Sequence, residues 1–153
     1  MAVVMVGARW GDIPLPFAAG FATFLLIATW ASVQHWYRTI PDIDLPIHFF
    51  TVGSLGAAAY FLLSGTELLP DVRDRTESPP PGAVVLWVTV VGVTVAVLWE
   101  FYEWTMEQLV PQDILVGYDD TLADLLAGML GCAAAGLFVV WWSRRMPPSS
   151  RRH

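Results

Sequence analysis

Acidic residues, with one histidine among them, recur at helical spacing in three separate parts of this chain. A helix places residues three or four positions apart on one face, so each group would form a stripe of acidic side chains. Carboxylates and imidazole are ligands for divalent metal ions, and they also act as general acids and bases. The three groups are Asp44 with His48, then Glu100, Glu103 and Glu107, and finally Asp120 with Asp124.

Three interpretations of these groups stay open from the sequence. They could bind a divalent metal ion, form a polar site that shares protons or receives a lipid headgroup, or build a structural hydrogen-bonded network. The chain contains neither HExxH nor the paired ExxH of di-iron bundles, so the spacing does not choose among zinc, manganese, iron and magnesium. The metal ligands predicted by the first interpretation are Asp44, His48, Glu100, Glu103, Asp120 and Asp124.

An enzyme built on this site would use His48, Glu100 and Glu103 as its catalytic groups. Either the metal ion or a Glu100/Glu103 pair that shares a proton would activate a water molecule, and His48 would act as the acid or base. The sequence leaves open whether the protein is an enzyme.

Helix capping is a simpler explanation for part of the pattern. Asp44, two residues before Pro46, fits a helix N-cap with proline in the first turn, and Thr121 with Asp124 matches a capping box. Capping does not explain the glutamates, because they lie at the end of a predicted helix, where the macrodipole disfavours negative charge.

Four long apolar stretches must position these residues. Hydrophobic residues make up 56% of the chain and charged residues 14%, whereas a soluble domain carries roughly a quarter charged residues. Each stretch is about 17 to 23 residues long, enough to cross ~30 Å of hydrocarbon as a helix. We therefore predict an all-α fold, a polytopic membrane protein with a four-helix transmembrane bundle. The predicted spans are about residues 15–37, 46–64, 83–104 and 121–142.

The basic residues predict the orientation of the bundle. The chain contains no lysine, and seven of its eight arginines fall on the side of the two termini, which leaves Arg38 on the other side. The positive-inside rule therefore places both termini of this multi-pass cell-membrane protein in the cytoplasm. The seven arginines are Arg9, Arg73, Arg75, Arg144, Arg145, Arg151 and Arg152.

One domain accounts for the chain in this interpretation. We expect residues 1–146 to form the transmembrane domain and residues 147–153 to form a disordered cytoplasmic tail. The start of the chain shows no cleavable signal peptide, so the first span is expected to be retained.

Two segments resemble known families of small membrane proteins. The first is DLPIHFF (44–50), and the second runs from EFYEWTMEQ (100–108) to DTLADLLAGMLG (120–131). They are similar to the VanZ-like and YjdF-like bacterial and archaeal families, which share an Asp followed by His-Phe, a Glu-rich helix end and an Asp-rich helix start. The resemblance covers about residues 42–136. It implies the same six residues as a shared site, and its VanZ-like branch implies a role in the cell envelope and glycopeptide resistance.

Glycines separate this chain from that pattern and also predict how its helices pack. The two families often place Asn or Asp four residues after the Asp of the last helix, where this chain has Gly128. Gly53 in the second span, with Gly128 and Gly131 in the fourth, would let these helices approach closely. Such packing would bring His48 toward Asp124.

We therefore expect a prokaryotic integral membrane protein with an extracytoplasmic acidic site that binds or processes an envelope lipid or glycan headgroup. A divalent metal ion is the cofactor that its residues suggest. The alternative is a non-enzymatic accessory or assembly subunit of a larger membrane complex. A small ion or proton translocator ranks last, because no charged residue lies deep in the inner half. The expected partners are membrane lipids and either partner membrane proteins or further copies of the chain, and no nucleic acid.

Overall fold

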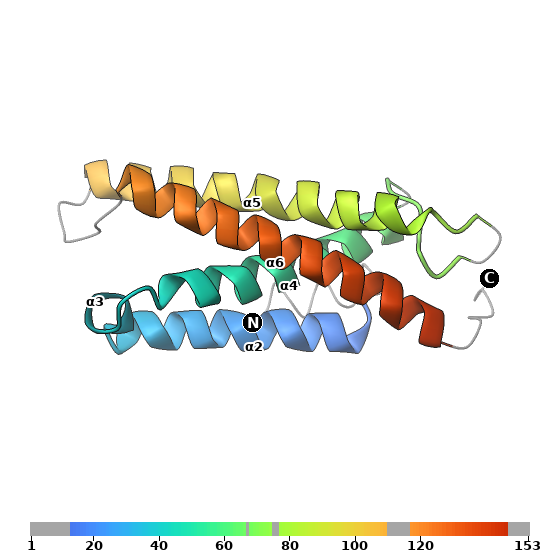
Figure 1. The fold of residues 1–153 in the computed structure, drawn as a ribbon, viewed down its shortest axis with the longest axis horizontal. Helices are drawn as coiled ribbons and strands as arrows, with labels where there is room; N and C mark the ends of the chain where they lie inside the picture. Colours follow the sequence, from blue (N-terminus) through green and yellow to red (C-terminus); the bar gives the residue numbers. More distant parts are fainter. Residues whose placement is uncertain (1–12, 67, 75–76, 110–116, 147–153) are drawn as a thin grey trace.

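The computed structural model describes residues 13–66, 68–74, 77–109 and 117–146. The four long helices in these ranges alternate in direction along the molecule (Figure 1), and no described residue forms a strand. The fold is therefore the all-α helical bundle that the sequence predicts. In chain order the elements are α2 (Leu15–Val33), α3 (Trp36–Thr39), α4 (Asp44–Gly65), α5 (Pro81–Leu109) and α6 (Tyr118–Arg145).

All four long helices are long and apolar enough to cross a membrane. Helices α4, α5 and α6 extend past the predicted spans at both ends, whereas α2 ends at Val33 instead of continuing to residue 37. The chain leaves α2 through His35, whose positive φ of 57° is not helical, and then forms the short α3. At ~1.5 Å per residue, the 29 residues of α5 extend about 43 Å, which exceeds the ~30 Å of a hydrocarbon layer.

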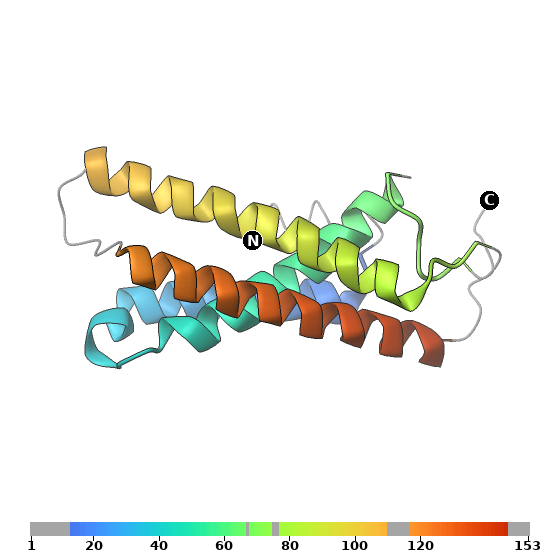
Figure 2. The same ribbon diagram turned by 45° about the horizontal axis from the view of Figure 1, so that its top comes forward.

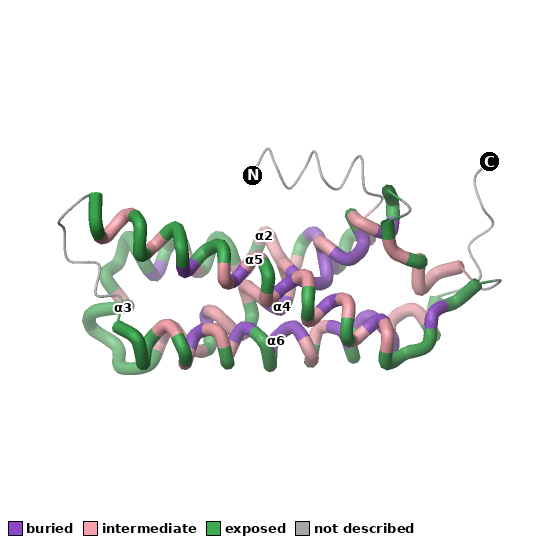
Figure 3. Tube along the Cα trace, turned by 90° about the horizontal axis from the view of Figure 1, so that it is seen from above, coloured by how far each residue is buried: buried purple, intermediate pink, exposed green. Residues whose placement is uncertain are grey.

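Helices α4, α5 and α6 pack on one another, and α2 packs mainly against α4. At the end of the bundle where α4 and α6 begin, α6 lies between α4 and α5 (Figure 2). Buried positions recur between exposed ones along α5 and α6 (Figure 3), as expected where one side of a helix is packed and the other faces lipid. The bundle is thus a three-helix core with α2 attached to its α4 side.

Glycines let α4 and α6 cross with their backbones in contact. A Cβ on Gly53 would lie 2.6 Å from the carbonyl oxygen of Gly131, and a Cβ on Gly131 would overlap the carbonyl group of Phe49. Gly128 faces Val52 across the same interface, where a Cβ would lie 3.2 Å from Val52 Cγ1. The close packing predicted for the second and fourth spans is confirmed.

The aromatic part of the core lies toward the opposite end, where α2 begins. Phe17 of α2 packs against Phe61 of α4, with ring centroids 4.8 Å apart. Tyr60 is fully buried, and its hydroxyl donates to the Pro70 carbonyl oxygen at 2.8 Å and accepts from the Val72 N–H at 3.0 Å. These bonds hold the segment that follows α4 against the core.

Some predictions concern parts of the chain that the structure does not describe. The single domain over residues 1–146 and the orientation of the bundle stay predictions. The positions outside the described residues are Arg9, Arg75, Arg151, Arg152 and the tail 147–153.

Candidate metal centre

Three helices bring acidic residues together at the end of the bundle where α4 and α6 begin. The first two turns of α4 carry Asp44 and His48, and the first two turns of α6 carry Asp120 and Asp124. Helix α5 runs in the opposite direction and contributes Glu100 near its C-terminal end. Because α6 lies between its two neighbours here (Figure 2), Asp124 reaches side chains from both.

The inner set consists of His48, Glu100 and Asp124. Ligand atoms of these three side chains all lie within 4.8 Å of one another. Glu100 and Asp124 are only 8% and 6% exposed, and His48 is partly buried. One imidazole and two carboxylates from three different helices therefore converge inside the bundle.

Asp124 is the buried group in this set whose hydrogen bonding is incomplete. Its Oδ1 is inaccessible to solvent and has no hydrogen-bond partner among the described residues. His48 Nδ1 lies 3.6 Å away, which is longer than the 2.7–3.2 Å of an N–H···O hydrogen bond. Two ligands at about 2.1 Å from one tetrahedral ion are about 3.4 Å apart. The spacing of these two atoms therefore suits shared coordination better than a direct hydrogen bond.

The outer set consists of Asp44, Asp120 and again Asp124, whose ligand atoms also lie within 4.8 Å of one another. Asp120 is exposed and Asp44 is partly buried, so this set opens toward the surface. Asp44 Oδ1 accepts a hydrogen bond from the backbone N–H of Leu45 at 3.0 Å, which holds the carboxylate at the start of α4.

Glu103 lies beside these two sets without joining either. Its negative charge is close enough to interact with those of Glu100 and Asp120, but its carboxylate is not among the ligand atoms that meet. Five of the six predicted ligands therefore converge. Their role as ligands, and the catalytic roles predicted for His48, Glu100 and Glu103, stay predictions.

The family of the chain follows from its match to a family model. Residues 1–145 match the model described as "Predicted membrane protein (DUF2238)". The chain belongs to the DUF2238 family. This description agrees with the predicted membrane location, but it carries neither the VanZ-like nor the YjdF-like name that the motifs suggest.

A curated relative of this DUF2238 protein comes from Thermotoga maritima and is described as an uncharacterized protein. It is 32% identical over 99 residues, which make up 64% of this chain and 47% of the relative. The match thus spans about half of the relative's length. No solved structure matches the chain.

Neither Asp44 nor Asp124 has the helix-capping role that the sequence predicts for it. Helix α4 begins at Asp44 itself, so its N-cap is Ile43 and not Asp44, although Asp44 Oδ1 accepts the first-turn N–H of Leu45. Helix α6 begins after Gly117, so Thr121 is already its fourth residue, and the predicted capping box with Asp124 is wrong. The reason is that the Thr121 N–H donates to the Gly117 carbonyl oxygen at 2.9 Å, which is already a helical hydrogen bond between residues i and i−4.

Tyr37 is a neighbour of the site that the acidic spacing did not reveal. It lies in α3, and its hydroxyl donates to the Ala28 carbonyl oxygen at 3.4 Å. Partial burial raises the pKa of Tyr37, and the negative charges of Glu103, Asp44 and Asp124 raise it further. No periodic pattern connects Tyr37 to the acids, because its position depends on how the chain reverses between α2 and α4.

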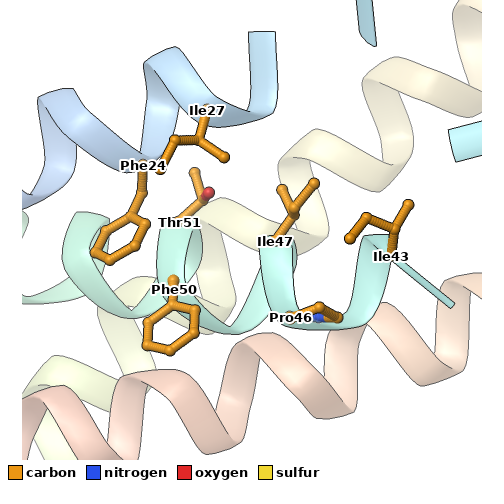
Figure 4. Close-up of a pocket in the computed structure, with 7 residues that line it drawn as sticks. All are labelled: Phe24, Ile27, Ile43, Pro46, Ile47, Phe50 and Thr51. Carbon is orange, nitrogen blue, oxygen red and sulfur yellow. The ribbon is translucent and has the colours of Figure 1, made fainter. Parts of the chain in front are cut away.

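An apolar groove lies between α2 and the first turns of α4 (Figure 4). Its volume is about 200 Å³, and Thr51 is the one polar residue among the seven that line it. Phe24 and Phe50 stack across it with ring centroids 4.9 Å apart. None of the lining residues belongs to the inner or the outer set, so the groove and the candidate metal centre are separate features.

Proposed function

We propose that this DUF2238 protein binds a divalent cation through the inner set and presents the cation to a lipid or glycan headgroup at the membrane surface. The observation that carries the proposal is the Oδ1 atom of Asp124. This atom is buried, has no hydrogen-bond partner among the described residues, and lies 3.6 Å from His48 Nδ1. A cation between the two side chains would satisfy both.

The burial of like charges also favours a cation. Glu100 and Asp124 are both buried, and their carboxylates lie within 4.8 Å of each other. Each buried charge costs several kcal/mol in desolvation after relaxation, and two carboxylates repel each other. A divalent ion would offset both costs, whereas a hydrogen-bonded network would need a donor for Asp124 Oδ1.

The ligand types restrict the identity of the ion. One imidazole with two carboxylates suits zinc, manganese or iron better than magnesium, which prefers oxygen ligands and keeps several waters. Three protein ligands leave an open position for a water molecule or a substrate oxygen. Asp120, exposed at the rim, marks the direction from which such a group would enter.

A headgroup is the substrate class that fits the place of this site. His48 lies one turn from the start of α4, and Asp124 lies less than two turns from the start of α6, close to where membrane helices reach the headgroup layer. With both termini in the cytoplasm, as the arginines predict, this layer is the extracytoplasmic one. The acidic residues would repel an anionic phosphate headgroup unless a cation stood between them.

The test is thermal unfolding of the purified protein in detergent, with chelator and with added zinc or manganese. The expected result is that the ion stabilises the wild type by about 2.7 kcal/mol at a concentration of 100 times its Kd. Asp124→Asn and Glu100→Gln should each lose most of this gain, and the double variant should lose little more because the residues bind as a unit. Elemental analysis of the same samples would identify the ion.

Asp119→Asn is the matched control, because Asp119 is an exposed carboxylate on the same helix and belongs to neither set. This variant should keep the full response to the ion. Equal stability of all the proteins with and without the ion would contradict the proposal, and would favour the alternative of an accessory subunit in a larger membrane complex.

A further inference from the structure

We infer that the site binds two divalent cations, with Asp124 as the carboxylate that bridges them. The inner ion would be held by His48, Glu100 and Asp124. The outer ion would be held by Asp44, Asp120 and Asp124. This inference rests on the proposed function and extends it from a single ion to a pair.

Asp124 is the residue through which the two sets meet. In each set one carboxylate oxygen of Asp124 lies within 4.8 Å of a ligand atom of each of the other two residues. The helix that carries Asp124, α6, lies between α4 and α5 (Figure 2). The Asp124 side chain is only 8% exposed, and Oδ1 is without a hydrogen-bond partner among the described residues. A carboxylate that belongs to both sets can bridge two ions, as in two-metal sites, whose ions are about 3.5–4 Å apart.

The balance of charge also favours two ions over one. The two sets contain four carboxylates in all, from Asp44, Glu100, Asp120 and Asp124. With all four ionised, one divalent cation would leave two negative charges uncompensated beside an apolar bundle, and two cations would compensate all four. The N-termini of α4 and α6 each offer only about half a positive charge, and this effect fades within the first turn. The helix dipoles therefore compensate Asp44 and Asp120 only in part.

The two positions differ in the ions that they would prefer. The inner position has an imidazole and is buried, which suits a transition metal. The outer position has only oxygen ligands and is open to water, which suits manganese, magnesium or calcium. Manganese fits both positions, and Mn²⁺ is therefore the probe for the test.

The experiment loads the purified full-length protein with Mn²⁺, removes the unbound ion, and measures manganese per chain together with the electron paramagnetic resonance spectrum. The wild type should hold two ions per chain and show the spectrum of an exchange-coupled pair. Asp120→Asn should remove only the outer ion, and Glu100→Gln only the inner one, so each should give one ion and an uncoupled six-line spectrum. Asp124→Asn should lose the coupling and reduce binding at both positions.

Asp119→Asn is again the control and should retain two coupled ions. A wild type that binds a single ion, unchanged by Asp120→Asn, would overturn the pair and leave the proposed function standing. Two ions without exchange coupling would overturn the bridging role of Asp124. A wild type that binds no manganese, zinc or iron would overturn both the pair and the proposed function.

Discussion

Replacement of Gly131 by alanine should force α4 and α6 apart. A Cβ on Gly131 would lie 2.7 Å from the carbonyl carbon of Phe49, about 0.7 Å inside ordinary van der Waals contact. The obstacle is backbone, so no change of rotamer removes it. Overpacking of this kind costs about 1–3 kcal/mol, and the better helix propensity of alanine returns at most about 1 kcal/mol. Because the obstacle is backbone, we expect a cost near the upper end of that range and a net loss of about 2 kcal/mol in the free energy of unfolding.

The same change should weaken binding at the inner set. The 3.6 Å approach of His48 to Asp124 crosses the α4–α6 interface, within two turns of Gly131, and a wider interface separates the two ligands. The assay is denaturant unfolding in detergent micelles followed by circular dichroism, with cation affinity measured on the same preparations. Gly20→Ala is the matched control, because beyond its chain neighbours and its own helix backbone no atom of the described residues lies within 4 Å of a Cβ there. It should be neutral or stabilising by at most about 1 kcal/mol.

Equal unfolding free energies for the two alanine variants would refute the argument that the glycines determine the helix crossing. A destabilised Gly131→Ala protein with unchanged cation affinity would refute the second part, in which the crossing positions His48 against Asp124.

Three further predictions concern other parts of the molecule. Tyr60→Phe should lower the free energy of unfolding by about 1–3 kcal/mol, because the Tyr60 hydroxyl donates one hydrogen bond to the 70–72 segment and accepts another from it. Glu103→Gln should lower the pKa of Tyr37, measured by tyrosinate absorbance, because the Glu103 charge raises that pKa. Since the folded state holds this proton more tightly than the unfolded state, the stability that Tyr37 contributes is present below about pH 10 and lost as the pH rises through its folded pKa. An impermeant maleimide added outside intact cells should label Asp119→Cys and miss Ser78→Cys.

Each of these predictions has a control. Tyr118→Phe removes a hydroxyl from a residue that is 78% exposed, so an equal loss in both tyrosine variants would contradict the role of the Tyr60 bonds. Glu107→Gln should leave the Tyr37 titration unchanged, and a shift as large as that of Glu103→Gln would contradict the local cause. The native Cys132 is fully buried and should not react, so labelling of Ser78→Cys alone would reverse the predicted topology.

The helices could be predicted from the sequence because length and apolar composition are local properties. Each of the four stretches is too long for a strand and long enough to span hydrocarbon, and each forms a long helix. The helix ends were less accurate, because they depend on single residues. His35 leaves α2 in a left-handed conformation, which histidine adopts only occasionally, and no composition signal marks it.

The candidate site could be predicted in part for a similar reason. Helical spacing placed Asp44 with His48 and Asp120 with Asp124 on common faces, and the structure brings these residues together. Spacing does not say which helix lies in the middle, so it did not single out Asp124 as the residue common to both sets. It also included Glu103, which is three residues from Glu100 but lies outside both sets.

The glycine at position 128 connects the packing of the bundle to the composition of its site. Position 128 lies one helical turn from Asp124, so a polar side chain there would lie next to the candidate site. In this chain even a Cβ would lie 3.2 Å from Val52 Cγ1, so a longer side chain would push α6 away from α4. His48 lies one turn from Val52 on α4, and its 3.6 Å approach to Asp124 depends on the short distance between these helices. The absence of a side chain at position 128 therefore lets His48 of α4 lie beside Asp124 in the candidate site.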